Sequence, residues 1–116
     1  MPVLDIKRYY SHKVIGDRAF SSNKKIVNKI GNITIDFFNQ NRIGTIIKHI
    51  PGHGLSKKDT HIKLPYISKN LNYLKNNDFS VFKNKKTIFA MTAHIVFEAL
   101  DKFECVTHSK KVIKYI

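Results

Sequence analysis

Side chains that can donate, accept or transfer a proton are concentrated between residues 48 and 61. This segment holds three histidines, two glycines, one proline and one aspartate. The polar and turn-forming residues are Lys48, His49, Pro51, Gly52, His53, Gly54, Asp59 and His61. Proline and glycine interrupt regular structure, so a loop is predicted. Titratable groups at this density on a loop are typical of ligand binding or catalysis.

Asp59 and His61 have the spacing of an acid–base pair. If the chain is extended there, side chains two residues apart point the same way, and the carboxylate can contact the imidazole. Such a contact fixes the tautomer of the ring and stabilises the imidazolium, which suits proton transfer. The alternative interpretation is an exposed loop histidine beside an aspartate that caps a helix.

The residues just before the loop predict a buried strand. Residues 44–48 begin with a β-branched, apolar run, so Lys48 and His49 fall where this strand ends. In α/β folds, catalytic residues collect at the carboxyl ends of strands. The alternative is a solvated lysine and a packed histidine. In the loop itself, Pro51, Gly52 and Gly54 suit a tight turn, and His53 is expected to support it by hydrogen bonding.

A metal-dependent hydrolase is the main alternative class of enzyme. His49, His53 and His61, with Asp59, are ligand types that zinc accepts. The spacing of the first two histidines imitates a pair on one helical face, but the intervening Pro51 and Gly52 prevent that helix.

Two further strands, near residues 2–5 and 87–93, are separated from strand 44–48 by helical patterns. Strands that alternate with helices pair in parallel through right-handed crossovers. Because parallel strands end at one edge, one edge of the sheet is expected to carry Asp5, His49 and His94.

Helices are predicted from about Ser22 to Gln40, from Ser68 to Asn76–Asn77, and after Ser109. On the first helix, the stripe at helical spacing is assigned to the core, and it consists of Ile26, Ile30, Ile33 and Phe37. Strand 87–93 reads as buried on both faces, which requires neighbouring strands that these residues do not supply. The predicted fold is therefore α/β, a partial (β/α)8 TIM barrel of parallel strands alternating with helices.

Composition narrows the class of protein. A chain of 116 residues with 42% hydrophobic residues is expected to be a single globular domain. No apolar run approaches the roughly 20 residues that span a bilayer, and the first residues do not form a signal peptide. The single cysteine, Cys105, excludes an internal disulfide framework and suits a reducing cytoplasm.

The formal net charge of +13 raises the possibility of nucleic-acid binding. The lysines are scattered along the chain, however, and aromatic residues are not interleaved with them as in single-strand binders. Arginine, the preferred base reader, occurs only at positions 8, 18 and 42. We therefore expect no specific nucleic-acid partner and no membrane partner.

Four blocks of sequence, in this order and spacing, resemble bacterial β-N-acetylglucosaminidases of glycoside hydrolase family 3, which are cytoplasmic enzymes of cell-wall recycling. The blocks are residues 2–5, residues 15–20, residues 48–54 with Asp59, Thr60, His61, Leu64 and Pro65, and residues 91–94 with Asp101. The third block, Lys-His-Ile-Pro-Gly-His-Gly, is highly specific.

The resemblance implies a glycosidase that hydrolyses terminal N-acetylglucosamine from peptidoglycan-derived muropeptides by a retaining mechanism, without metal or cofactor. It implies that His61 is the general acid/base, oriented by Asp59, and that Arg18, Lys48 and His49 bind substrate. The alternative for Arg18 is an ordinary salt bridge.

In this family the nucleophilic aspartate lies in a Ser-Asp-Asp-Leu-like motif, which residues 1–116 do not contain. The chain is therefore expected to be a central fragment of the catalytic domain. Its expected partners are a carbohydrate substrate and a second polypeptide that completes the barrel. The competing interpretation is a truncated, inactive fragment that binds sugar weakly at most.

Overall fold

A parallel sheet organises one part of the computed structural model, which describes residues 1–13, 15–57 and 63–116. Strand β1 (Ile46–Ile50) pairs in parallel with β3 (Phe89–Thr92). On the other side of β1, Val3 forms parallel bridges to both Lys48 and Ala19. The predicted parallel arrangement is confirmed, although residues 2–5 contribute only bridges.

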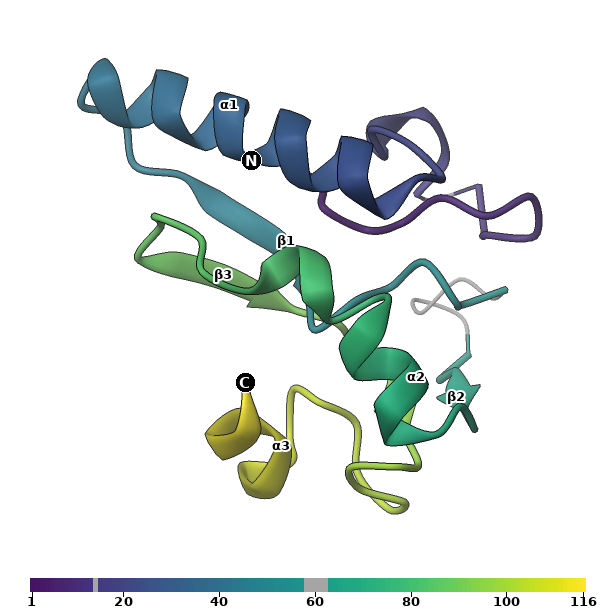
Figure 1. Ribbon diagram of the computed structural model, residues 1–116. Coiled ribbons are helices and arrows are strands. Elements are labelled where there is room, and N and C mark those ends of the chain that lie inside the picture. Colours follow the sequence, from purple (N-terminus) through teal and green to yellow (C-terminus); the bar gives the residue numbers. More distant parts are fainter. Residues whose placement is uncertain (14, 58–62) are drawn as a thin grey trace.

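The long helix α1 (Lys24–Gln40) packs across this sheet (Figure 1). Its N-cap is Asn23, whose side chain accepts a hydrogen bond from the Lys25 amide at 2.9 Å. The cap is thus one residue later than the predicted Ser22, whereas Gln40 ends the helix as predicted. A Cβ on Gly31 would lie 2.6 Å from a side-chain carbon of Leu4, so this glycine allows close packing.

The predicted core stripe of α1 is wrong. Ile26, Ile33 and Phe37 are 45%, 59% and 59% exposed, and Ile30 is only partly buried. The buried residues are instead Val27, Gly31 and Ile35. These positions lie about 100° around the helix from the predicted stripe. Apolar residues occupy both faces, and the sheet packs against the face that contains the small Gly31.

The remaining elements are shorter. They are η1 (Gly16–Arg18) near the N-terminus, and then β2 (Tyr66–Ile67), α2 (Leu71–Asn76), η2 (Ser80–Phe82), β4 (Val96–Phe97) and α3 (Lys110–Tyr115). Strand β2 pairs in parallel with β4, which was not predicted because two-residue strands carry no periodicity. Helix α2 is capped by Asn70 instead of the predicted Ser68. Ser109 caps α3 as predicted.

Buried side chains form two main clusters. One lies between α1 and the β1–β3 sheet and includes Leu4, Val27, Ile35 and Ile47. The other joins β2, α2, β4 and α3, and includes Leu74, Ile95, Phe97, Val106 and Val112. The structure therefore has a helix-covered sheet and a second packed region.

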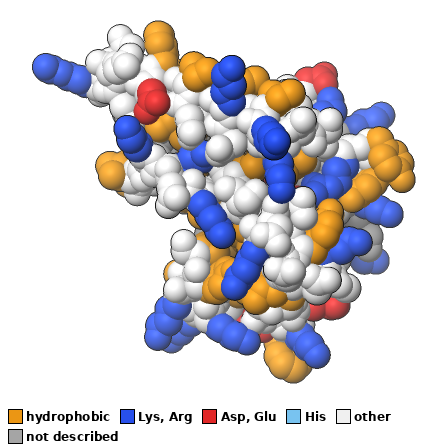
Figure 2. All heavy atoms as spheres, viewed as in Figure 1, with side chains coloured by type: hydrophobic (Ala, Val, Ile, Leu, Met, Phe, Trp, Pro, Cys, Tyr) orange, Lys and Arg blue, Asp and Glu red, His pale blue; other side chains and the backbone are white. Residues whose placement is uncertain are grey.

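The surface of β3 is apolar and uncovered. Phe89 and Met91 on β3 are 55% and 41% exposed, and Ile88, just before the strand, is 84% exposed. Lysine and arginine side chains are spread over the whole face seen in Figure 2 and form no single stripe. Among the described residues, no helix is long and apolar enough to cross a membrane.

Candidate functional site

The carboxyl edge of the sheet carries a hydrogen-bonded pair, Asp5 and His49. Asp5 Oδ2 lies 2.7 Å from His49 Nδ1. The Asp5 side chain is fully buried, and that of His49 is 16% exposed. The pair forms because Val3 pairs with Lys48, which places the residues that follow each of them side by side. A carboxylate on Nδ1 fixes the ring orientation and leaves Nε2 for a ligand.

Asp5 also holds the loop that follows β1. Its Oδ1 accepts a hydrogen bond from the backbone amide of His53 at 2.6 Å, and the His49 amide lies 3.4 Å from both carboxylate oxygens. A buried carboxylate requires such partners because desolvation of an unpaired charge is costly. The sequence placed Asp5 at this edge but gave it no role. Its signal was a single acid within the apolar segment from Val3 to Ile6.

The glycines of the loop are required by close packing. Gly52 has φ +146°, and a Cβ there would lie 3.0 Å from Asp78 Cβ. A Cβ on Gly54 would lie 2.1 Å from the carbonyl oxygen of Ile6. Pro51 is buried in the same turn, and the peptide bonds before His49 and Pro51 are both cis. The packing is consistent with the predicted loop-supporting role of these residues.

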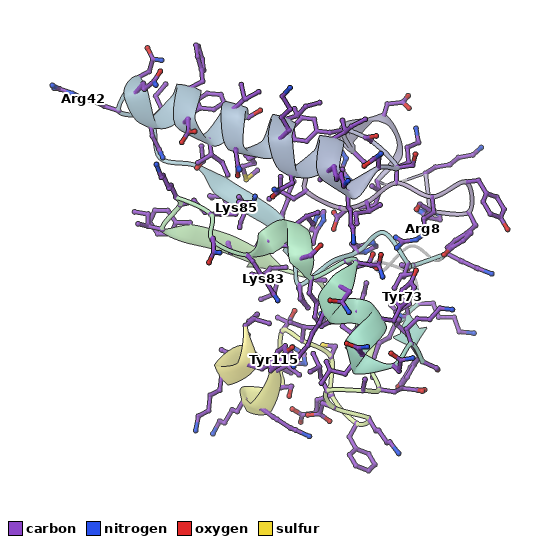
Figure 3. The ribbon with its side chains drawn as sticks, in the orientation of Figure 1. Arg8, Arg42, Tyr73, Lys83, Lys85 and Tyr115 are labelled. Carbon is purple, nitrogen blue, oxygen red and sulfur yellow. The ribbon has the colours of Figure 1, made fainter. Side chains whose placement is uncertain are left out.

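An ion pair fixes the outer side of the loop. Arg8 Nη1 and Nη2 donate to Asp78 Oδ1 and Oδ2, both at 2.8 Å, and Nη1 also donates to the Ile6 carbonyl at 3.1 Å. Burial works to lower the pKa of Arg8, but the hydrogen bonds and charge of Asp78 outweigh it, so this pKa is raised. Figure 3 shows Arg8 reaching toward α2, near Tyr73. Sequence reasoning missed this pair, because its partners are 70 residues apart.

His53 is 3% exposed, and its Nδ1 has no hydrogen-bond partner among the described residues. Burial lowers the pKa of His53, against the attraction of Asp5, and nearby His49 lowers it further. The ring therefore favours the neutral form. The loop-supporting hydrogen bond is made by the backbone amide of His53, while the ring lies 5.3 Å from that of His49.

The other predicted substrate-binding residues either pair with residue 3 or lie next in sequence to a residue that pairs with it. Lys48 precedes His49 on β1 and is partly exposed. Arg18 ends η1, is exposed, and precedes Ala19, which pairs with Val3 on the side opposite Lys48. The predicted catalytic residues, Asp59 and His61, lie outside the described residues.

His94 follows the carboxyl end of β3, but its side chain contacts a different loop. Its Nδ1 lies 3.4 Å from both Thr107 Oγ1 and Cys105 Sγ. Of the three residues expected at one edge, Asp5 and His49 are in direct contact, and His94 is oriented toward the segment before α3. Within residues 1–13, 15–57 and 63–116, no group of three or more His, Cys, Asp or Glu side chains could hold a metal ion.

Known proteins resemble this chain in sequence. Residues 1–116 match the Glycosyl hydrolase family 3 N terminal domain. A β-hexosaminidase of Photobacterium profundum is 38% identical over 104 residues, which are 86% of this chain and 30% of that protein. A β-hexosaminidase of Tolumonas auensis is 33% identical over 104 residues, again 30% of its length. The chain thus spans about a third of the length of these relatives.

Solved structures also resemble this chain in fold. A glycoside hydrolase family 3 β-N-acetylglucosaminidase from Paenibacillus superposes with a TM-score of 0.93 and 28% identity, over 98% of this chain and 22% of that one. NagZ from Neisseria gonorrhoeae, in complex with N-trifluoroacetyl-D-glucosamine, superposes with a TM-score of 0.89 and 27% identity, over 100% and 34% of the two chains.

Proposed function

We propose that this chain, which belongs to glycoside hydrolase family 3, forms part of the sugar-binding edge of a β-N-acetylhexosaminidase. The observation that carries the proposal is the pair of buried Asp5 and His49 at the carboxyl edge of a parallel sheet, next to Lys48. The similarity to β-hexosaminidases along most of the chain supports the same activity.

The pair suits the recognition of a sugar. With Nδ1–H donated to Asp5, the Nε2 of His49 is proposed to accept a hydrogen bond from a hydroxyl group of the ligand. The Lys48 ammonium supplies donors only, so the two side chains together satisfy both kinds of group on a polyol. Arg18 precedes Ala19, which pairs with Val3 on the side opposite Lys48, and it is proposed to bind the same substrate.

The proposed chemistry is hydrolysis with retention. His61 protonates the oxygen of the leaving group and then activates water, while Asp59 orients its ring and stabilises the imidazolium. The nucleophile is an aspartate in a Ser-Asp-Asp-Leu-like motif, supplied by further sequence or by a second polypeptide that completes the barrel. A metal is not required for these steps, because the charge develops next to ionisable side chains.

The proposed substrate is an N-acetylglucosamine-containing muropeptide, released during peptidoglycan recycling in the cytoplasm. The support is the Lys48–Gly54 block, whose resemblance is to enzymes of that process. The single cysteine, Cys105, fits a reducing compartment.

The test is hydrolysis of an aryl N-acetyl-β-glucosaminide by the protein that carries this chain. Asp5→Asn should lower kcat/KM by about 100-fold, because it removes the charge that orients His49. Asp36→Asn, on the exposed surface of α1, is the matched control and should leave kcat/KM unchanged. Retention is tested by NMR of the first anomer released. Full activity in Asp5→Asn would remove the basis of this proposal.

A further inference from the structure

A buried ion pair packs against the loop that carries His53. Its partners are Arg8 and Asp78, whose side chains are 15% and 1% exposed. Such a pair adds little net stability, because the cost of desolvating two charges offsets most of their attraction. Stability alone is therefore a weak reason to bury these charges, and their contacts with the loop indicate another role.

The pair approaches the backbone on both sides of His53. A Cβ on Gly52 would lie 3.0 Å from Asp78 Cβ. A Cβ on Gly54 would lie 2.9 Å from Arg8 Nη1. Because protein interiors are close-packed, the two partners of the ion pair set the path of the loop backbone before and after His53.

The same guanidinium group also holds the strand-end segment that carries Asp5. Arg8 Nη1 donates to the carbonyl oxygen of Ile6, which directly follows Asp5, at 3.1 Å. Asp5 Oδ1 accepts a hydrogen bond from the His53 amide at 2.6 Å, and Asp5 Oδ2 lies 2.7 Å from His49 Nδ1. Contacts therefore run from the ion pair to the backbone, from the backbone to Asp5, and from Asp5 to the His49 ring.

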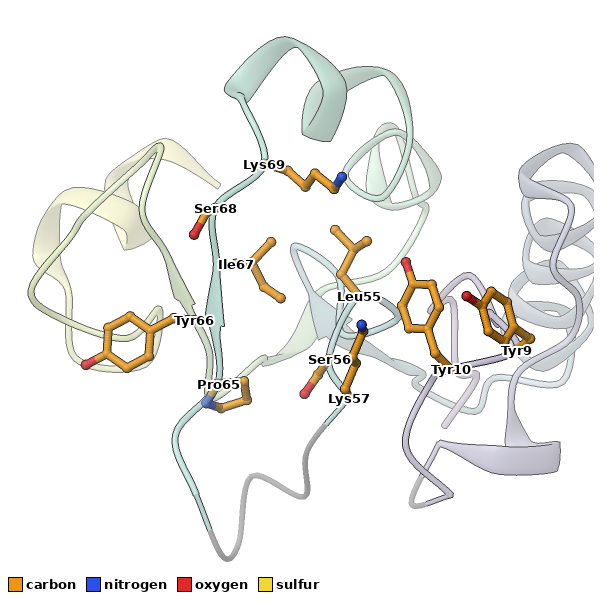
Figure 4. A pocket seen from close by; sticks show the side chains of 10 residues that line it. All are labelled: Tyr9, Tyr10, Leu55, Ser56, Lys57, Pro65, Tyr66, Ile67, Ser68 and Lys69. Carbon is orange, nitrogen blue, oxygen red and sulfur yellow. The ribbon is translucent and has the colours of Figure 1, made fainter.

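The segment that follows Arg8 is tied to the same loop. Ser11 Oγ donates to the Gly54 carbonyl oxygen at 2.7 Å and accepts from the Arg8 amide at 2.8 Å. Figure 4 shows Tyr10 beside Lys57, whose Nζ lies 5.0 Å from the Tyr10 ring centroid. The backbone of Arg8 is thus fixed against the loop, and its guanidinium group reaches Asp78 from a defined position.

We propose that Arg8 and Asp78 are positioning residues of the sugar-binding edge. They hold the His53 amide on Asp5, and Asp5 in turn fixes the direction of His49 Nε2. The inference rests on the proposed function for the identity of the ligand as a sugar. A bidentate guanidinium–carboxylate pair suits this role, because its two parallel hydrogen bonds fix distance and angle together. A displacement of about 1 Å is enough to weaken a site of this kind.

The first readout is the ¹H NMR signal of His49 Hδ1 in the protein that carries this chain. This signal is expected at low field, because the proton lies in a short hydrogen bond to a carboxylate. Its absence in His49→Ala identifies it. Arg8→Gln should broaden or abolish the signal, because the loop no longer holds Asp5. Lys7→Gln should keep it: this matched control removes the same charge from the neighbouring residue, whose ion pair with Asp17 is exposed.

The second readout is the dissociation constant of N-trifluoroacetyl-D-glucosamine, the ligand in the NagZ complex described above, from a ¹⁹F NMR titration. Arg8→Gln should raise this Kd about tenfold, because a displaced supporting residue misplaces the group that it holds. Lys7→Gln should leave it unchanged. A purely structural role would lower the fraction of protein that binds without changing the Kd of the folded fraction, so the Kd separates positioning from stability.

The Arg8→Gln variant is expected to fold, because Asp78 can lose its charge. Burial raises the pKa of the Asp78 carboxyl, against the lowering effect of Arg8, so the protonated form is favoured without Arg8. Arg8→Lys is a second variant that keeps the buried positive charge. A lysine ammonium cannot reproduce the planar fork that contacts both carboxylate oxygens, so the Kd should rise about threefold. Far-UV circular dichroism checks the fold of each variant.

The inference is overturned if folded Arg8→Gln keeps both the His49 signal and the Kd of the parent protein, or if Lys7→Gln has the same effect as Arg8→Gln. If Arg8→Gln does not fold, an unchanged Kd in Arg8→Lys overturns it equally. If the parent protein binds no sugar, the proposed function fails, and the His49 signal still tests whether the ion pair positions this ring. If the parent protein binds the sugar and the variants match it, only the positioning role fails.

Discussion

The carboxyl edge at Asp5 and the outer face of β3 differ in how their side chains are covered. The polar groups at Asp5 are buried and hydrogen-bonded, whereas the apolar side chains on β3 are exposed. Asp5 is completely buried, with the His49 ring and the His53 amide as hydrogen-bond partners. Phe89 and Met91, in contrast, are 55% and 41% exposed on a strand of apolar residues. Parallel sheets are normally covered on both faces. The hydrogen-bond network around Asp5 is thus formed within the described residues, whereas the apolar side chains of β3 remain exposed.

The same contrast occurs on α1. Its inner face is closed against the sheet by Val27 and Ile35, which are 0% and 1% exposed. Its outer stripe of Ile33 and Phe37 is as exposed as β3. In a barrel, a helix touches the sheet on one side and neighbouring helices on its flanks. The exposed stripe is therefore consistent with a flank that meets another helix in the complete domain.

The largest expected effect concerns activity. The 116-residue chain alone should release no detectable chromophore from an aryl N-acetyl-β-glucosaminide. A retaining mechanism needs a nucleophile and an acid/base, and these residues hold the candidate His61 but no Ser-Asp-Asp-Leu-like segment. The measurement is absorbance of the released phenol, with the protein that carries this chain as the positive control. Robust turnover that disappears in His61→Ala would show that the site is complete without further sequence.

Substitution of the loop glycine should have the next largest effect. Gly54→Ala should lower the free energy of unfolding by more than about 3 kcal/mol, because it forces an overlap with backbone. The added Cβ would lie 2.1 Å from the Ile6 carbonyl oxygen. Gly44→Ala, where nothing lies within 4 Å, is the control, and its effect should be within about 0.5 kcal/mol. Urea denaturation measures both. Equal effects would mean that the loop is not packed against residue 6.

The two faces of α1 give an intermediate effect. Val27→Ala should lower the free energy of unfolding by about 2 kcal/mol, because it removes buried methyl groups and leaves a cavity. Ile33→Ala, at a 59% exposed position, should cost less than about 0.5 kcal/mol. Both are read from urea denaturation of the purified chain. A larger cost for Ile33 would show that the stripe is covered in solution, for example by association of copies, which sedimentation would detect.

The sequence predicted features that depend on local chemistry. Parallel strands, the end of α1 and the Ser109 cap follow from short-range patterns, and the placement of Asp5 and His49 at one edge followed from the parallel order, whereas the His94 side chain turns toward Thr107. The α1 core stripe was predicted wrongly because both Ile33 and Val27 lie on apolar faces, and only packing against Leu4 decides between them. The Asp78–Arg8 pair depends on a contact between distant segments, which periodicity does not encode.

The smallest expected effect is a pH dependence of stability from His53. Because its pKa in the folded state is lowered, folding favours the neutral ring. In the unfolded chain the pKa of a histidine is about 6.5. The stabilising contribution is therefore present above about pH 6.5 and is lost as the pH falls through the lower pKa of the folded state.

His53→Gln should accordingly reduce the decrease in unfolding free energy between pH 7.5 and pH 5.5, measured by urea denaturation at each pH. His108→Gln, an exposed histidine, is the control and should leave the pH dependence as in the parent chain. The sign distinguishes the two histidines, because burial makes protonation of the His53 ring costly in the folded state. A parent chain that gains stability below pH 6 would instead mean that the attraction of Asp5 for a charged His53 outweighs the cost of burying that charge.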